Sequence, residues 1–193
     1  MDWCAGGGGK TLALAAGMDN QGRILAFDTS ADRLESAAHR IARAGVSIIE
    51  TRTLRESQAL IAGLKDSVDC VLVDAPCSGS GTWRRNPAAK WRTTPDTIAE
   101  YAARQREILN AAAEVVRPGG SLVYATCSLF RAENHAQVDA FLQSHRDFRL
   151  GSVPTRWRQF ISDDPPSEMP LLLLTPLENK TDGFFIAVFE RKA

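Results

Sequence analysis

Two cysteines stand directly after short apolar runs of this sequence. Cys77 follows the run Val71 to Val73 and the residues Asp74-Ala75-Pro76, and Cys127 follows the run Leu122 to Thr126. If both runs are strands of an open α/β sheet, both thiols stand at carboxyl strand ends, where such sheets bind ligands. A thiolate is a soft, strong nucleophile that can add to a pyrimidine ring. The pair therefore predicts covalent chemistry on a base, with a second group that handles protons or helps to release the product.

A glycine-rich segment near the start of the chain predicts a cofactor site. It reads Cys4-Ala5-Gly6-Gly7-Gly8-Gly9-Lys10-Thr11, between an opening strand at 1–4 and a helix. Glycines let backbone N–H groups approach a ligand closely, and the start of a helix favours an anionic group. Asp28, at the end of the next strand, can accept hydrogen bonds from both hydroxyls of a ribose. Together they indicate a nucleoside-containing cofactor across the strand ends.

The same segment leaves an alternative open. Gly9-Lys10-Thr11 imitates the end of a phosphate-binding loop, although the first glycine of that motif would fall on Cys4. The run that ends at Asp74 resembles a strand end that binds Mg²⁺. A nucleotide hydrolase would, however, leave Cys77 and Cys127 unexplained.

Strand and helix signals alternate along the chain, which predicts a doubly wound α/β fold with a mostly parallel, seven-stranded sheet. The expected strands are 1–4, 23–28, 47–50, 68–74 and 121–125, and the expected helices are 10–16, 31–44, 55–64, 95–116 and 132–143. Thr94 and Pro95 mark the start of the longest helix. The Pro-rich segment 154–170 is expected to be an irregular loop, followed by a closing antiparallel hairpin of 171–174 and 184–190.

Composition indicates one globular domain. The 193 residues are 44% hydrophobic, enough for a sizeable core. Lys+Arg and Asp+Glu both number 23, so any attraction for nucleic acid must come from a local patch. Four widely spaced cysteines without a Cys-x-x-Cys pair predict free thiols in a reducing cytoplasm and no metal site. No membrane-spanning segment is visible, and we expect a monomer that does not bind membranes.

A local basic patch follows Cys77. The segment 83–92 holds four cations, two indoles and no acid. Cations contact phosphates and indoles stack on bases, which favours RNA as the partner. The predicted RNA contacts are Arg84, Arg85, Lys90 and Trp91.

These motifs resemble those of the Fmu/Sun (Nop2-like, RsmB-like) family of S-adenosylmethionine-dependent RNA (cytosine-5) methyltransferases. The paired cysteine motifs are the specific part of a resemblance that spans nearly the whole chain. Its main segments are Cys4 to Thr11, Phe27 to Ser30 with Arg33, Asp74 to Gly79, Thr126 to Ser128 and Asp182 to Phe185. Secondary matches are Arg85-Asn86-Pro87, Lys90-Trp91, Gln105 and Glu133-Asn134.

The resemblance implies a mechanism and a set of roles. Cys127 would add to carbon 6 of a cytosine in ribosomal or transfer RNA, carbon 5 would accept the methyl group, and Cys77 would assist the elimination of the thiolate. Asp74 would hydrogen-bond the base, and Lys10 would favour the thiolate or orient the base. The residues implied to bind S-adenosylmethionine are Cys4, Ala5, Gly6, Gly7, Gly8, Gly9, Lys10, Asp28 and Asp74.

The sequence departs from the family at two places. Gly6-Gly7 replace the usual Ala-Pro, which makes the loop more flexible and predicts weaker cofactor binding. Residues 50–53 lack the Asp that the family places near the adenine amino group. A non-catalytic cofactor- or RNA-binding module of the same fold therefore stays an alternative. Because a central strand rarely opens a natural chain, we expect upstream sequence, with an RNA-binding region, outside these residues.

A second alternative concerns the roles of the two cysteines. DNA cytosine-5 methyltransferases use a Pro-Cys nucleophile, which Pro76-Cys77 would satisfy, whereas the RNA family uses the later cysteine. The presence of both cysteines favours RNA as the substrate and Cys127 as the nucleophile.

Overall fold

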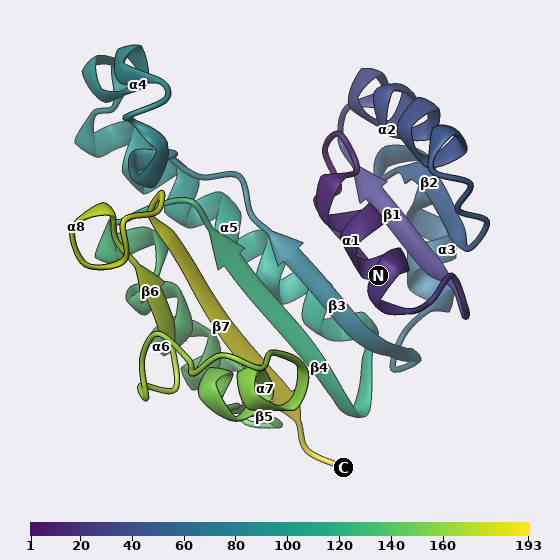
Figure 1. Cartoon of the computed structure of the whole chain (residues 1–193). Helices are drawn as coiled ribbons and strands as arrows, with labels where there is room; N and C mark the ends of the chain where they lie inside the picture. The colour runs from purple at the N-terminus through teal and green to yellow at the C-terminus, as the bar shows by residue number, and fades with distance from the viewer.

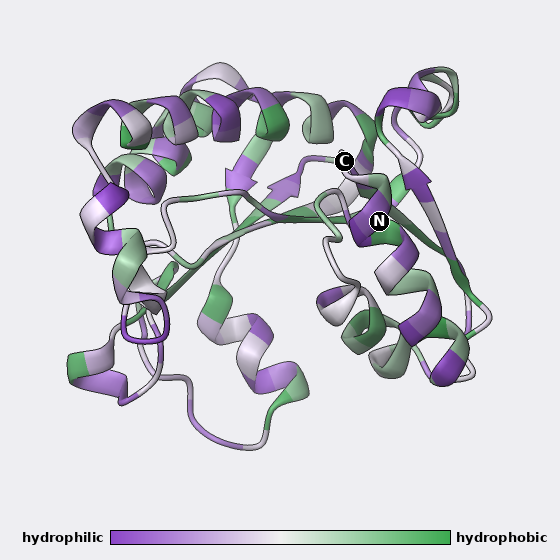
Figure 2. Ribbon diagram, turned by 90° about the horizontal axis from the view of Figure 1, so that it is seen from above, coloured by the Kyte–Doolittle hydropathy of each residue, from purple (hydrophilic) through white to green (hydrophobic).

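A twisted sheet with helices on both faces forms the framework of the protein (Figures 1 and 2). The computed structural model describes residues 1–193. The strands are β1 (Ile24–Asp28), β2 (Ile49–Thr53), β3 (Val68–Asp74), β4 (Val116–Thr126), β5 (Phe148–Leu150), β6 (Leu172–Leu174) and β7 (Phe184–Arg191). The strands β1 and β2 pair in parallel, as do β3 and β4. Asp2 joins the two halves because it bridges Ala26 of β1 and Leu72 of β3, so the opening strand expected at 1–4 is reduced to one bridging residue.

The α/β class and the closing hairpin are confirmed, but the prediction of a mostly parallel sheet is wrong in its pairing. The last strand, β7, is antiparallel to all three of its partners, β4, β5 and β6. The hairpin is formed by β6 and β7, and β7 then pairs with β4 along six residue pairs. The second half of the sheet is therefore mixed.

The helices agree with most of the predicted ones. They are α1 (Gly9–Gly17), α2 (Ala31–Arg43), α3 (Gln58–Gly63), α4 (Pro87–Arg92), α5 (Pro95–Val115), α6 (His135–Ser144), α7 (Val153–Phe160) and α8 (Pro176–Asn179). The predicted start of the longest helix is confirmed, because the Thr94 side chain accepts a hydrogen bond from the Thr97 N–H at 3.2 Å. None of the helices combines the length and apolar character that crossing a bilayer needs.

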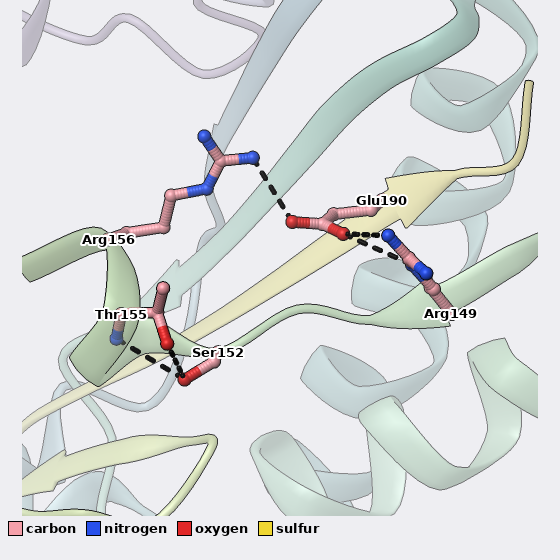
Figure 3. Close-up of polar contacts among 5 residues, drawn as sticks. All are labelled: Arg149, Ser152, Thr155, Arg156 and Glu190. Carbon is pink, nitrogen blue, oxygen red and sulfur yellow. Dashed lines mark hydrogen bonds and ion pairs between the residues drawn. The ribbon is translucent and has the colours of Figure 1, made fainter. Parts of the chain in front are cut away.

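Helix α7 corrects the prediction of an irregular loop at 154–170. Ser152 caps it by accepting from the Thr155 N–H at 3.3 Å, and Pro154 is compatible with the first turn of a helix. Glu190 of β7 then accepts from Arg156 of α7 at 3.1 Å and from Arg149 of β5 at 3.0 Å (Figure 3). These ion pairs hold α7 and β5 against the end of β7.

Alternation along the strands sorts the core onto the two faces of the sheet. Leu122 and Tyr124 of β4 pack in the main core with residues of α5 and α6, whereas Val123 and Val188 lie in a smaller cluster with Val153 of α7. Strands β1, β3 and β4 run parallel to one another, so their carboxyl ends lie at one edge of the sheet. The residues at or just after these ends are Asp28, Asp74 and Cys127.

Candidate active site

The two predicted thiols lie in one site. The Sγ atoms of Cys77 and Cys127 are 3.4 Å apart. The strands before them are parallel neighbours, with Asp74 of β3 opposite Ala125 of β4. The loop after Cys77 is also anchored, since the Gly81 N–H donates to the Cys127 carbonyl at 2.9 Å. The convergence expected from their positions at strand ends is therefore confirmed.

The two thiols differ in acidity. A hydrogen bond from Cys77 lowers the pKa of Cys127 to about 7, and the Lys10 ammonium also favours its thiolate. The same hydrogen bond and burial raise the pKa of Cys77 far above its usual range. Near neutral pH, Cys127 is the sulfur that ionises while Cys77 keeps its proton. Cys127 is therefore the more readily ionised of the two thiols.

Thiol alkylation would detect this asymmetry. The rate of Cys127 carbamidomethylation by iodoacetamide should rise with pH and reach half its plateau near pH 7, because only the thiolate reacts. Peptide mass spectrometry of timed samples would give the rate at each cysteine. In Cys77→Ala the midpoint should move to higher pH, since the stabilising donor is gone. An unchanged midpoint in that variant would contradict the assignment.

A buried carboxylate ties the two cysteine loops together. Glu133 is fully buried. Its Oε1 accepts from the Ser78 N–H at 2.8 Å and from Gln105 Nε2 at 3.1 Å. Its Oε2 accepts from the hydroxyls of Ser78 and Ser128, each at 2.5 Å. Since Ser78 and Ser128 each follow one of the cysteines, Glu133 links the two loops that carry the thiols.

Asn134 fixes the second loop further. Its Oδ1 accepts from the Thr126 hydroxyl at 2.6 Å and its Nδ2 donates to the Ser128 carbonyl at 2.8 Å. Gln105, Glu133 and Asn134 had only matched the family pattern, without a role. Asn134 binds residues six and eight positions before it, whereas Glu133 and Gln105 also bind partners that lie 28 to 55 residues away, which no local signal could have revealed.

Lys10 and Asp74 form an ion pair beside the thiols. Helix α1 begins at Gly9, which directs Lys10 in its first turn towards the end of β3, and Lys10 Nζ lies 2.6 Å from Asp74 Oδ2. The same ammonium lies 5.5 Å from the centre of the Phe184 ring. The structure thus brings four predicted residues together: Lys10, Asp74, Cys77 and Cys127.

A cavity of about 590 Å³ borders this site at the ends of β1 and β3. Of the residues predicted to bind the cofactor, Cys4, Gly6, Asp28 and Asp74 line it, whereas Ala5, Gly7, Gly8, Gly9 and Lys10 do not. Gly8 instead has a packing role: its φ is +77°, and a Cβ there would lie 2.9 Å from Ala37 Cβ. The wall also includes Trp3, Leu54, Tyr101 and Ile108, none of which had been predicted to bind the cofactor.

The lining of this cavity fits a nucleoside. The Asp28 carboxylate is held by the N–H groups of Gly6 at 2.8 Å and Ser30 at 2.9 Å, and it can still accept from two hydroxyls. Gly6 adopts φ +54°, a backbone conformation that glycine favours. The apolar and aromatic wall suits a base, although no Asp follows β2 to contact its amino group.

The predicted RNA contacts divide into two pairs. Arg84 and Arg85 lie 3.3 and 2.6 Å from the Asp182 carboxylate, so an acid from outside the basic segment balances their charge. Lys90 and Trp91 lie on α4 and are exposed, with the Lys90 ammonium 5.7 Å from the centre of the Trp91 ring. This pair is therefore open to a partner from solvent.

Known proteins match this chain along most of its length. A family model described as "16S rRNA methyltransferase RsmB/F" matches residues 1–190. The chain is 41% identical over 189 residues to "Probable ribosomal RNA small subunit methyltransferase B" of Synechocystis sp., covering 96% of this chain and 41% of that protein. It is 42% identical over 191 residues to "Ribosomal RNA small subunit methyltransferase F" of Escherichia coli, covering 97% of this chain and 39% of that protein.

Solved structures agree with these matches. The structure of NSun6 from Pyrococcus horikoshii with SFG matches with a TM-score of 0.83 and 30% identity, covering 100% of this chain and 47% of that one. The chain spans about two fifths of the length of the two curated relatives described above.

Proposed function

The chain belongs to the RsmB/F family of 16S rRNA methyltransferases, and from that premise we propose that it transfers a methyl group from S-adenosylmethionine to carbon 5 of a cytosine in ribosomal RNA. The observation that carries this proposal is the pair of thiols, 3.4 Å apart at two adjacent strand ends. Relatives named as ribosomal RNA methyltransferases support the substrate. A similar structure that contains SFG, an S-adenosylmethionine analogue, supports the cofactor.

Cys127 is the nucleophile of the proposed reaction. Its thiolate adds to carbon 6 of the cytosine, which makes carbon 5 electron-rich. The cofactor supplies the electrophilic methyl group that carbon 5 accepts. A base then removes the proton from carbon 5, the electron pair of that C–H bond restores the double bond between carbons 5 and 6, and the thiolate leaves. The Cys77 thiol donates a hydrogen bond to the departing sulfur and so stabilises it.

The remaining site residues orient the base and the RNA. Asp74 contacts the N3/N4 edge of the cytosine, and Lys10 holds that carboxylate and favours the Cys127 thiolate. Carbon 6 must be open to attack, so the target base is unpaired or flipped out of its helix. Lys90 and Trp91 contact the RNA strand. We expect the protein to act as a monomer in the cytoplasm.

Tritium release tests the proposed function. The protein is incubated with S-adenosylmethionine and ribosomal RNA that carries tritium at carbon 5 of its cytosines. Tritium release that depends on the cofactor, with 5-methylcytosine found by bisulfite sequencing, is the expected result. Tight binding of ATP but not of S-adenosylhomocysteine would favour the nucleotide hydrolase instead. Binding of S-adenosylhomocysteine without methylation of any RNA would favour the inert module.

Cofactor affinity should depend on Asp28. In Asp28→Ala the dissociation constant of S-adenosylhomocysteine, measured by calorimetry, should rise roughly 10-fold or more, because hydrogen bonds to a charged group are each worth about 1.5–3 kcal/mol. Asp32→Ala is the matched control, since Asp32 is exposed in the first turn of α2 and lines no part of the cavity. Equal affinities of the two variants would contradict this role of Asp28.

A further inference from the structure

A second cavity, of about 370 Å³, opens beside Cys77. Its lining comes from the loop that follows β3, from helix α4 and from the start of α5, and Cys77 lines it but Cys127 does not. Tyr101 lines both this cavity and the cofactor cavity, so the two adjoin. Its volume is at the lower end of the range for small-ligand pockets, which suits one nucleotide. Because Cys127 does not line this cavity, the cavity suits a nucleotide beside the target base better than the target base itself.

The lining of this cavity is mostly polar. Ser78, Thr82, Thr93 and Thr97 contribute hydroxyls and Asn86 an amide. Asn86 occupies the N-cap position of α4, yet its side chain makes no capping hydrogen bond. An Asn at that position usually accepts hydrogen bonds from the helix N–H groups. Because Asn86 does not, its amide keeps its donors and its acceptor for another partner. Such an amide can read the edge of an unpaired base.

One cation lines the same cavity. Arg92 is exposed at the end of α4, and no carboxylate lies within ion-pair distance of it, in contrast to Arg84 and Arg85 on Asp182. An arginine without an internal partner is suited to bind a phosphate through its fork of N–H donors. The neighbouring Trp91 is 83% exposed and offers a surface for stacking.

We propose that this cavity binds the nucleotide next to the target cytosine in an unpaired RNA strand, with its phosphate on Arg92 and the edge of its base on Asn86. The proposal rests on the proposed function for the identity of the target. It goes beyond that function in assigning a separate subsite for a flanking nucleotide. The two residues have different tasks: Arg92 provides affinity for any sequence, and Asn86 provides preference at one position.

Binding of short unpaired RNA oligonucleotides tests the subsite. Each oligonucleotide has one cytosine, with adenine, guanine and uracil placed in turn on either side, and fluorescence anisotropy gives the dissociation constants of the full chain. Arg92→Gln should weaken binding of all sequences and reduce the salt slope by about one. The control Arg43→Gln removes an exposed cation at the end of α2 and should change neither.

Asn86→Ala should act differently from Arg92→Gln. It should reduce the preference among bases at one flanking position by about fivefold or more, and leave the other side unchanged. Equal effects of Arg92→Gln and Arg43→Gln, or the same base preference in Asn86→Ala and the wild type, would overturn the subsite. Methyl transfer is read separately: a wild type that discriminates flanking bases but methylates none of these RNAs would overturn the proposed function and leave the subsite in place. Thermal melting checks that each variant is folded.

Discussion

Replacing Cys127 by alanine should abolish methyl transfer without leaving a covalent protein–RNA complex, whereas replacing Cys77 by alanine should trap that complex. Without the Cys127 sulfur no adduct forms at carbon 6, so activity should fall by at least about 10³-fold. Without the Cys77 thiol, addition and methyl transfer continue but the departing thiolate loses the donor that lies 3.4 Å away. Denaturing gels with labelled RNA would show the trapped complex as a band of reduced mobility.

A third cysteine provides the control for these two variants, and the reversed trapping result would contradict the assigned roles. Cys70→Ala removes an exposed thiol of β3 that lines neither the cofactor cavity nor the cavity beside Cys77, and it should behave as the wild type. A trapped complex in Cys127→Ala, and none in Cys77→Ala, would reverse the two roles. It would then make Cys77 the nucleophile, as in the DNA enzymes.

Local signals in the sequence predicted the elements that carry the site. The apolar run at 68–74 predicted β3 correctly, and Thr94 with Pro95 predicted where α5 begins. The pairing of β7 with three strands could not be predicted, because the hydrophobic pattern of a strand does not state its neighbours. Helix α7 was missed because its proline and polar residues are typical of a loop. The contacts that hold it, such as the ion pair between Arg156 and Glu190 of β7, form only in the folded chain.

The residues of the site likewise divide into those that the sequence could predict and those that it could not. Residue type and position at a strand end were sufficient to place Cys77, Cys127 and Asp28, because parallel strands deliver their carboxyl ends to one edge. Tyr101 lines both cavities, and it belongs to α5, which follows the basic segment 83–92 in the sequence. The acid that balances Arg84 and Arg85 comes from Asp182, about a hundred residues later in the chain. Such contacts are properties of the folded chain and have no local pattern.

The distance between the thiols should depend on Glu133, which touches neither of them. In Glu133→Ala, four donors from Ser78, Ser128 and Gln105 lose their acceptor in a buried site. Each unsatisfied buried group costs about 1–3 kcal/mol, so the free energy of unfolding should fall by about 3 kcal/mol or more. In the fraction that stays folded, displacement of the thiols by about 1 Å should slow adduct formation by roughly 100-fold. Urea unfolding and single-turnover trapping on the Cys77→Ala background measure the two effects.

The variant Glu133→Gln distinguishes a positioning role of Glu133 from a purely stabilising one. The amide oxygen can still accept from the Ser78 N–H and from Gln105, and the Ser78 and Ser128 hydroxyls can rotate to accept from the amide nitrogen. This variant should therefore keep most of the stability and lie within about 10-fold of the reference rate, since the loop spacing is retained. If Glu133 only stabilises the fold, Glu133→Ala at low temperature should form the adduct at the reference rate and show the same alkylation midpoint for Cys127. A positioning role instead requires that both readouts shift while the dissociation constant of the RNA stays unchanged, because Glu133 is fully buried and cannot contact the strand.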